Sequence, residues 1–140
     1  MRACVLDASV VVKWFLDEEG SEAARSLRSA DLAVSAPHLL FLEVANVFWK
    51  HARKGALEIS TGSDVLAALG EAPIEWYEDG ALFKEAYGLA TELGRTVYDS
   101  SYLALAVRLD SVLITADRKF YDAVSASRLA SRIVWIEDAE

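Results

Sequence analysis

The stretch that decides the fold is Arg-Ala-Cys-Val-Leu-Asp-Ala-Ser-Val, residues 2–10. Its apolar run predicts a buried strand over residues 2–6, which ends at an acid, Asp7, and a helix is expected over residues 9–16. Short apolar runs alternate with longer helical stretches along the rest of the chain, which is typical of βαβ units and a parallel sheet. The sequence therefore predicts an α/β fold, a three-layer α/β/α sandwich with a central parallel sheet.

The other expected elements follow the same alternation. Strands are expected over residues 32–35, 74–77, 112–115 and 133–136. Helices are expected over residues 21–29, 38–54, 60 or 61 to 69, 81–93, 99–109 and 119–130. Pro37 stops the second strand and Gly94 ends a helix, as these residue types commonly do.

Composition limits the possible functions. The 140 residues fit a single domain, residues 1–140, and a hydrophobic fraction of 54% supports a folded core. The single cysteine, Cys4, excludes an internal disulfide and a cysteine-rich zinc site, and we expect it to be a buried, inert thiol. No uncharged stretch has the length of a membrane span, so we expect no membrane association and a cytoplasmic location.

The net charge of −8 argues against binding nucleic acid through a basic surface alone. Three interpretations are compatible with this acidity. In the first, the substrate is not a nucleic acid. In the second, a metal ion supplies local positive charge, and in the third, a basic partner chain binds the protein. Charge alone does not choose among them.

Four acidic residues stand next to apolar stretches: Asp7, Glu43, Asp99 and Asp117. Asp7 and Asp117 follow strands, and Glu43 lies about two turns into a helix that starts at the same edge, where open parallel sheets bind ligands. Two bare carboxylates ~4 Å apart repel each other by about 4 kcal/mol at an effective dielectric near 20. A cluster of such acids therefore predicts a bound divalent metal.

Each acid also has a simpler interpretation. Asp7 and Asp117 could cap the helices that follow them, and Asp99 could sit in the first turn of a helix capped by Thr96. Glu43, in the middle of an apolar helix, could pair with Lys50 or face a gap. The conjunction of the four acids, rather than any one of them, supports a site.

Several polar residues near the acids are weaker candidates. Ser9 and Thr115 each lie two positions from an acid and could orient a carboxylate, although such hydroxyls often bond nearby backbone. Asn46 shares a helical face with Glu43. Arg118 and Lys119, beside Asp117, could contact phosphates. The densest basic patch lies at a helix end and comprises Lys50, His51, Arg53 and Lys54.

Four motifs in this order resemble the PIN domain, and most of all the VapC-like toxins of type II toxin–antitoxin pairs. They are residues 5–10 (VLDASV), 42–47 (LEVANV), 98–106 (YDSSYLALA) and 113–120 (LITADRKF). The resemblance spans almost the whole chain, and all four acidic positions match.

The resemblance implies a ribonuclease that uses Mg²⁺ or Mn²⁺, a homodimer, and a cognate antitoxin that masks the site. It implies a sheet in the order 3-2-1-4-5, which would bring Asp99 beside the other acids. It also maps the metal-binding and catalytic acids onto Asp7, Glu43, Asp99 and Asp117, with Ser9 or Thr115 as the accessory polar position.

Two other functions remain open. An aspartyl-phosphate phosphatase would also place Asp7 after the first strand, but it usually needs a second Asp two residues later, where this chain has Ser9. It also needs a late lysine, for which Lys119 is a loose candidate. A non-catalytic binding module of the same fold would be favoured by the loss of an acid, and all four are present.

The helix around residues 39–49 is apolar over most of its circumference. It is therefore either buried in the domain or shared with another chain. We favour sharing, and we expect a groove or dimer face formed with the help of Val11, Trp14, Phe15 and the helix over residues 21–29. The tryptophans are expected to pack.

Overall fold

A computed structural model describes residues 2–139 and contains a five-stranded parallel sheet in the order β3-β2-β1-β4-β5. The strands are β1 (Arg2–Leu6), β2 (Leu32–Pro37), β3 (Ile74–Tyr77), β4 (Val112–Thr115) and β5 (Ile133–Trp135). Both the parallel direction and the strand order are as predicted. In the centre of the sheet, Val5 of β1 lies between Ser35 of β2 and Leu113 of β4.

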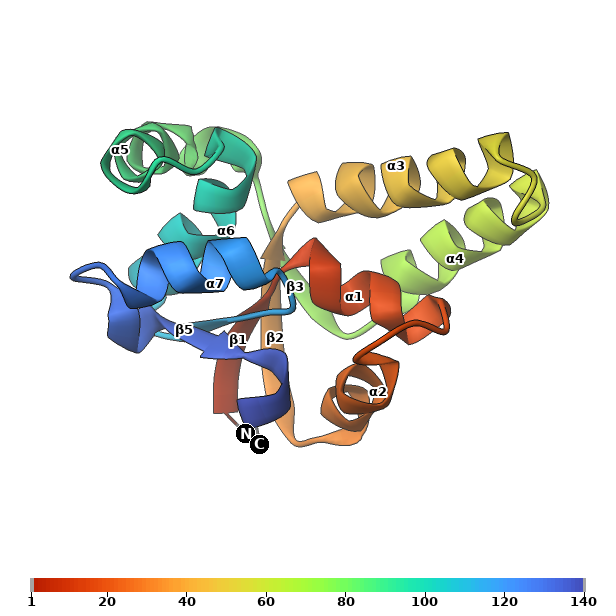
Figure 1. The fold of residues 1–140 in the computed structure, drawn as a ribbon, viewed down its shortest axis with the longest axis horizontal. Helices are drawn as coiled ribbons and strands as arrows, with labels where there is room; N and C mark the ends of the chain where they lie inside the picture. The colour runs from red at the N-terminus through yellow and green to blue at the C-terminus, as the bar shows by residue number, and fades with distance from the viewer. Residues whose placement is uncertain (1, 140) are drawn as a thin grey trace.

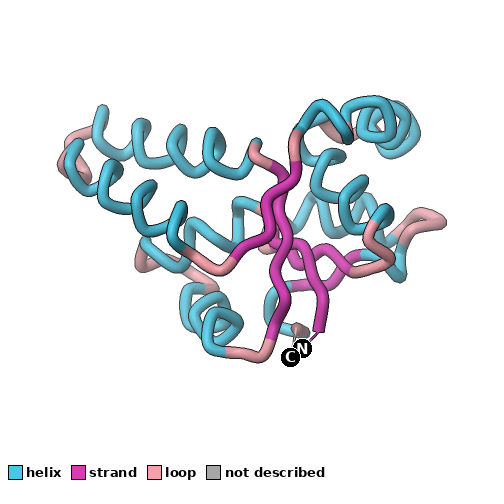
Figure 2. Tube along the Cα trace, turned by 180° about the vertical axis from the view of Figure 1, so that it is seen from behind, coloured by secondary structure: helices cyan, strands magenta, loops and turns pink. Residues whose placement is uncertain are grey.

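Helices cover both faces of the sheet and make the three-layer sandwich that the sequence predicts (Figure 1). One side carries α1 (Ala8–Phe15), α2 (Ser21–Ser29), α3 (Leu39–Arg53) and α4 (Ile59–Glu71). The other side carries α5 (Phe83–Leu93), α6 (Val97–Arg108) and α7 (Arg118–Ser125). Seen from behind, in Figure 2, the sheet runs between these two groups of helices. None of the helices among the described residues has the length and apolar composition of a membrane span.

Most helix boundaries agree with the prediction to within two residues, but the helix predicted over residues 119–130 is too long. Helix α7 ends at Ser125, and a separate 3₁₀ turn covers Ala130–Arg132. The hydroxyl of Ser127 donates to the carbonyl of Val124 and accepts the N–H of Leu129. These local bonds compete with the helical pattern and turn the chain toward β5.

The core lies where β1 and β4 meet the helices on both faces. Val5, Leu6 and Leu113 are completely buried there, together with Leu105 of α6. Cys4 is also buried, and burial raises the pKa of its thiol to about 11, as expected of an inert side chain.

Helices α3 and α4 extend together beyond the sheet (Figure 1). Only Leu40, Val44 and Phe48 of α3 are buried, whereas Leu42 is 70% exposed and Trp49 is 55% exposed. The interpretation that this helix is buried within the domain is therefore wrong, and so is the expectation that Trp49 packs inside.

The expectation that Val11 helps to form a groove or dimer face is also wrong, whereas Trp14 lines a cavity of about 440 Å³ with Leu27 and Arg28 of α2. Val11 is fully buried within the single chain. Trp14 packs inward because its indole N–H donates to the carbonyl of Ala24 in α2, 2.9 Å away.

The packing of β4 predicts a large cost for truncating its central residue. Leu113→Ala should lower the free energy of unfolding by about 3 kcal/mol, because it leaves a cavity in the core between the sheet and the helices that cover it. Ile59→Ala, at a position that is 81% exposed, is the matched control and should change stability little. Urea denaturation measures both variants, and equal effects would contradict this description of the core.

Candidate active site

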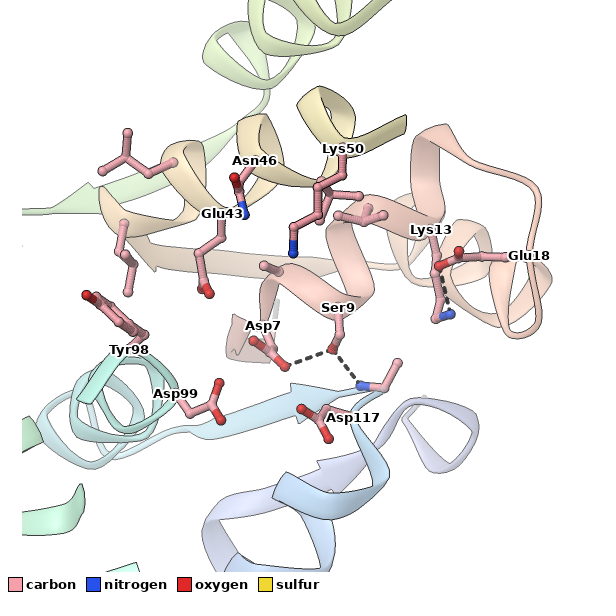
Figure 3. Close-up of a pocket in the computed structure, with 16 residues that line it drawn as sticks. Asp7, Ser9, Lys13, Glu18, Glu43, Asn46, Lys50, Tyr98, Asp99 and Asp117 are labelled. Atoms are coloured by element: carbon pink, nitrogen blue, oxygen red, sulfur yellow. Dashed lines mark hydrogen bonds and ion pairs between the residues drawn. The ribbon is translucent and has the colours of Figure 1, made fainter. Parts of the chain in front are cut away.

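The four acids predicted from the sequence line one cavity of about 640 Å³ (Figure 3). They come from four places in the chain: the ends of β1 and β4 and the helices α3 and α6. The strands β1 and β4 are neighbours and parallel, so Asp7 and Asp117 reach the same edge. The order of the strands in the sheet also brings Asp99 to this edge, as the resemblance to the PIN domain implies.

Asp7 occupies the N-cap position of α1 but does not act as a helix cap. Its side chain accepts no hydrogen bond from that helix's backbone. Instead, Oδ2 accepts hydrogen bonds from the hydroxyls of Ser9, at 2.7 Å, and Thr115, at 2.8 Å. The carboxyl group is buried, with 4% of the residue exposed. The capping interpretation is therefore wrong for Asp7.

The two hydroxyls that hold Asp7 are themselves fixed by backbone groups. Ser9 Oγ accepts the N–H of Ala116 at 3.0 Å, and Thr115 Oγ1 accepts the N–H of Asp117 at 3.1 Å. Since a hydroxyl has a single hydrogen, each donates to Asp7 and accepts from the backbone. Both residues thus orient this carboxylate and leave its Oδ1 without a hydrogen bond from the described residues.

Glu43 is held from α6 rather than from its own helix. Its Oε1 accepts a hydrogen bond of 2.6 Å from the hydroxyl of Tyr102. Lys50, the partner considered from the sequence, makes no ion pair with Glu43. The carboxylate points into the cavity (Figure 3).

The other two acids line the cavity and also lie at capped helix starts. Thr96 accepts the N–H of Asp99 at 3.0 Å and starts α6, as predicted. Asp117 accepts the N–H of Phe120 at 3.1 Å through Oδ1 and starts α7. Its other oxygen, Oδ2, remains directed to the site.

Arg95 was missed by the sequence reasoning. One terminal nitrogen, Nη2, lies 2.8 Å from Asp99 and 3.5 Å from Asp117, so one guanidinium bridges two acids. The guanidinium also lies over the ring of Phe120. Arg95 lies just before the N-cap of α6, four positions from Asp99, and this closeness in sequence to an acid was the available signal.

Burial, with a smaller contribution from neighbouring acids, raises the pKa values of Asp7, Glu43 and Asp99. Burial raises the pKa of Asp7 to about 7, against the lowering effect of the Ser9 and Thr115 hydroxyls, and the charges of Asp99 and Glu43 raise it further. Burial also raises the pKa of Glu43, with a contribution from Asp99. The pKa of Asp99 is raised by burial despite its ion pair with Arg95. Such a cluster favours the uptake of a proton or a cation.

The donor set suits a hard divalent cation, since the cavity is lined by carboxylates and by no histidine or cysteine. Among residues 2–139, however, no three acidic, histidine or cysteine side chains are grouped closely enough to hold an ion as they stand. Tyr102 holds Glu43, and Arg95 holds Asp99 and Asp117. The residues fit Mg²⁺ or Mn²⁺ in donor type and charge, and the metal itself remains a prediction.

The remaining predicted residues separate into two groups. Asn46 lines the cavity one turn after Glu43. Arg118 instead stacks on Trp135, 3.8 Å from the ring centroid, and lines a neighbouring cavity of about 360 Å³. Lys119 is exposed and lines neither cavity.

The fold and the cavity together define a class: parallel α/β proteins with clustered carboxylates at the carboxyl edge of the sheet. A family model described as the PIN domain matches residues 4–125, and the chain belongs to this family.

Similar proteins agree with this assignment. The chain is 36% identical to Ribonuclease VapC3 of Pyrobaculum aerophilum over 124 residues, which cover 87% of this chain and 95% of that protein. It is 30% identical to Ribonuclease VapC9 of Mycobacterium tuberculosis over 122 residues, covering 87% and 91%.

Solved structures show the same fold. The crystal structure of PAE2754 from Pyrobaculum aerophilum has a TM-score of 0.69 and 27% identity, covering 97% of this chain and 85% of that chain. A toxin–antitoxin complex from Klebsiella pneumoniae has a TM-score of 0.67 and 16% identity, covering 97% and 99%.

The raised pKa of Asp7 predicts how stability depends on pH. With divalent cations removed by chelation, the free energy of unfolding should fall as pH rises from about 4 to about 7, because the folded state then binds the proton more tightly than the unfolded state. The rise in the pKa of Asp7 from 3.8 to about 7 corresponds to a decrease of up to about 4 kcal/mol in the free energy of unfolding.

Asp7→Asn removes this titration, so the variant should be more stable than the wild type at pH 8 and similar to it at pH 4. Urea denaturation at a series of pH values measures the effect. Asp64→Asn, at an exposed position on α4, is the control. Parallel profiles for Asp7→Asn and the wild type would show that Asp7 does not carry a raised pKa.

Proposed function

We propose that this chain is a ribonuclease toxin of a type II toxin–antitoxin system, and that it hydrolyses RNA phosphodiester bonds with Mg²⁺ or Mn²⁺. The observation that carries the proposal is the meeting of Asp7, Glu43, Asp99 and Asp117 in one cavity. The relatives named VapC ribonucleases support the activity, since they match this chain over nearly their whole length.

Each residue has a part in this chemistry. Asp7, Glu43 and Asp99 would be the main ligands of the ion, and Asp117 would complete the set. The hydroxyls of Ser9 and Thr115 bond one oxygen of Asp7 and so orient the other toward the cavity. When bound, a divalent ion lowers the pKa of a coordinated water and offsets charge on the phosphate.

Contacts from Tyr102 and Arg95 fix the other acids. Tyr102 orients Glu43 through its hydroxyl, and burial raises the pKa of Tyr102, which keeps that hydroxyl protonated as a donor. Arg95 keeps Asp99 and Asp117 facing one another. Such outer contacts pre-organise a site and lower the cost of arranging its ligands.

The phosphatase alternative has less support. Ser9 stands where a second Asp would act, and its hydroxyl is bonded to Asp7. Lys119 lies outside the cavity. The non-catalytic module is not favoured either, because all four acids are present and line the cavity.

An antitoxin is the proposed protein partner. Similar solved structures include a toxin–antitoxin complex from Klebsiella pneumoniae and VapBC2 from Rickettsia felis. A basic antitoxin segment would complement the net charge of −8. We also propose a homodimer that covers the exposed apolar side chains of α3, Leu42 and Trp49.

Loss of the central acid should abolish cleavage. Asp7→Asn should reduce hydrolysis of single-stranded RNA by more than about 100-fold in Mg²⁺ or Mn²⁺, because it removes a charged ligand that contributes several kcal/mol to catalysis. Asp64→Asn is again the control. Binding of Mn²⁺, measured by electron paramagnetic resonance, should weaken in parallel.

A small phosphomonoester assayed beside the RNA separates the two enzyme classes. The proposal expects RNA cleavage and little phosphomonoester hydrolysis. Retained RNA cleavage in Asp7→Asn, or the reverse substrate preference, would overturn it.

The dimer proposal has a direct test in solution. Light scattering should give a mass of about twice 15.3 kDa for the purified chain. Introducing a charge through Trp49→Glu should shift the population toward the monomer, because it places a carboxylate in an apolar interface. A monomeric mass for the wild type, with and without antitoxin, would refute the homodimer.

A further inference from the structure

Lys50 is directed into the acidic cavity from the last turns of α3. Glu43, Asn46 and Lys50 follow one another at helical spacing, so they lie on the same face of α3, and all three line the cavity. Figure 3 shows the Lys50 ammonium group extending from the helix toward the acids. Within residues 2–139, no carboxylate forms an ion pair with this ammonium group.

The charges that line the cavity leave Lys50 as an available cation. The lining contains five acids and two lysines: Asp7, Glu18, Glu43, Asp99, Asp117, Lys13 and Lys50. Lys13 is occupied, since its ammonium group donates to Glu18 at 3.0 Å and to the carbonyl of Glu19 at 2.6 Å. Lys13 and Arg95 each offset one of the five acidic charges, and a bound divalent ion would offset two more. One negative charge remains, so the charge of Lys50 favours the entry of an anionic strand.

Other nearby cations are engaged elsewhere or point away. Arg95 is bound to Asp99 and Asp117. Arg118 stacks on Trp135, and Arg53 lies over the ring of Trp49. Of the basic patch at the end of α3, only Lys50 lines the cavity.

We propose that Lys50 binds a backbone phosphate of the RNA strand, next to the phosphate that is cleaved. The proposal rests on the ribonuclease function proposed above. An ammonium group offers a full charge and three donors, which suits a phosphate oxygen. Lys50 lies two turns after Glu43 on the same face of α3. Because the four acids would hold the ion and the reacting phosphate, we assign Lys50, which enters the cavity from α3, to the adjoining phosphate.

A contact of this kind acts on substrate binding more than on the chemical step. Lys50→Gln should raise KM for a single-stranded RNA roughly tenfold and leave kcat nearly unchanged, because the contact is made equally before and during reaction. The slope of log(kcat/KM) against log[salt] should become shallower by about 0.7, the value for one lost phosphate contact on a single strand.

Two further variants make the result specific. Lys50→Arg keeps the charge and should recover most of the affinity. Lys54→Gln removes the same charge from the same end of α3, at an exposed position that does not line the cavity, and should change KM less than about twofold. Thermal unfolding without RNA should be the same for Lys50→Gln and the wild type, since Lys50 has no ion pair to lose.

The outcomes separate the two proposals. A wild type that cleaves RNA, together with a Lys50→Gln variant that behaves like Lys54→Gln, would overturn the assignment of Lys50 alone. A fall in the melting temperature of Lys50→Gln without a change in KM would assign Lys50 a structural role instead. A wild type that does not cleave any RNA in the presence of divalent metal would overturn the ribonuclease function and the Lys50 contact with it.

Discussion

The site depends on one constraint, the burial of the Asp7 carboxyl group at the end of the central strand. Burial and neighbouring acids raise its pKa to about 7, so an ionised Asp7 is costly unless a cation lies close to it. Ser9 and Thr115 bond one of its oxygens and leave the other free of hydrogen bonds from the described residues. This buried acid is therefore held in a fixed orientation while its charge remains uncompensated. A bound metal ion would compensate that charge.

The order of the strands places Asp7 where other segments can reach it. Strand β1 has β2 on one side and β4 on the other, so the chain connections diverge at the carboxyl end of β1. Open parallel sheets bind ligands at such a point. Helix α3 brings Glu43 from one side, and α6 brings Asp99 from the other. The cavity is thus a consequence of the topology, and its acidity is a consequence of the residues at these ends.

The sequence was sufficient to predict the five strands and the place of Asp7, Glu43 and Asp117 at one edge of the sheet, because strand ends and apolar runs are local features. The place of Asp99 beside them followed only from the resemblance to the PIN domain. It could not decide whether Asp7 caps a helix, since a cap and a ligand occupy the same position after a strand. It missed the contacts of Tyr102 with Glu43 and of Arg95 with Asp117, because these join segments that only the fold brings together. The Tyr102 hydroxyl bonds Glu43 and joins α6 to α3, and Arg95, just before α6, forms an ion pair with Asp117 at the start of α7.

Adjacency in sequence was misleading for Arg118 and Lys119. Each successive residue in a helix turns by about 100°. Residues directly after Asp117 therefore point away from the cavity that Asp117 lines, and Arg118 packs on Trp135 instead. Lys50 is far from Asp117 in sequence yet lines the same cavity, because its position on α3 repeats the face of Glu43.

Anomalous diffraction from crystals of the wild-type chain grown with Mn²⁺ would show whether these acids share one cation. We expect an anomalous peak inside the cavity, in contact with the free oxygen of Asp7 and within reach of Glu43 and Asp99. Crystals that contain Mn²⁺ at other positions but show no peak in this cavity would contradict it.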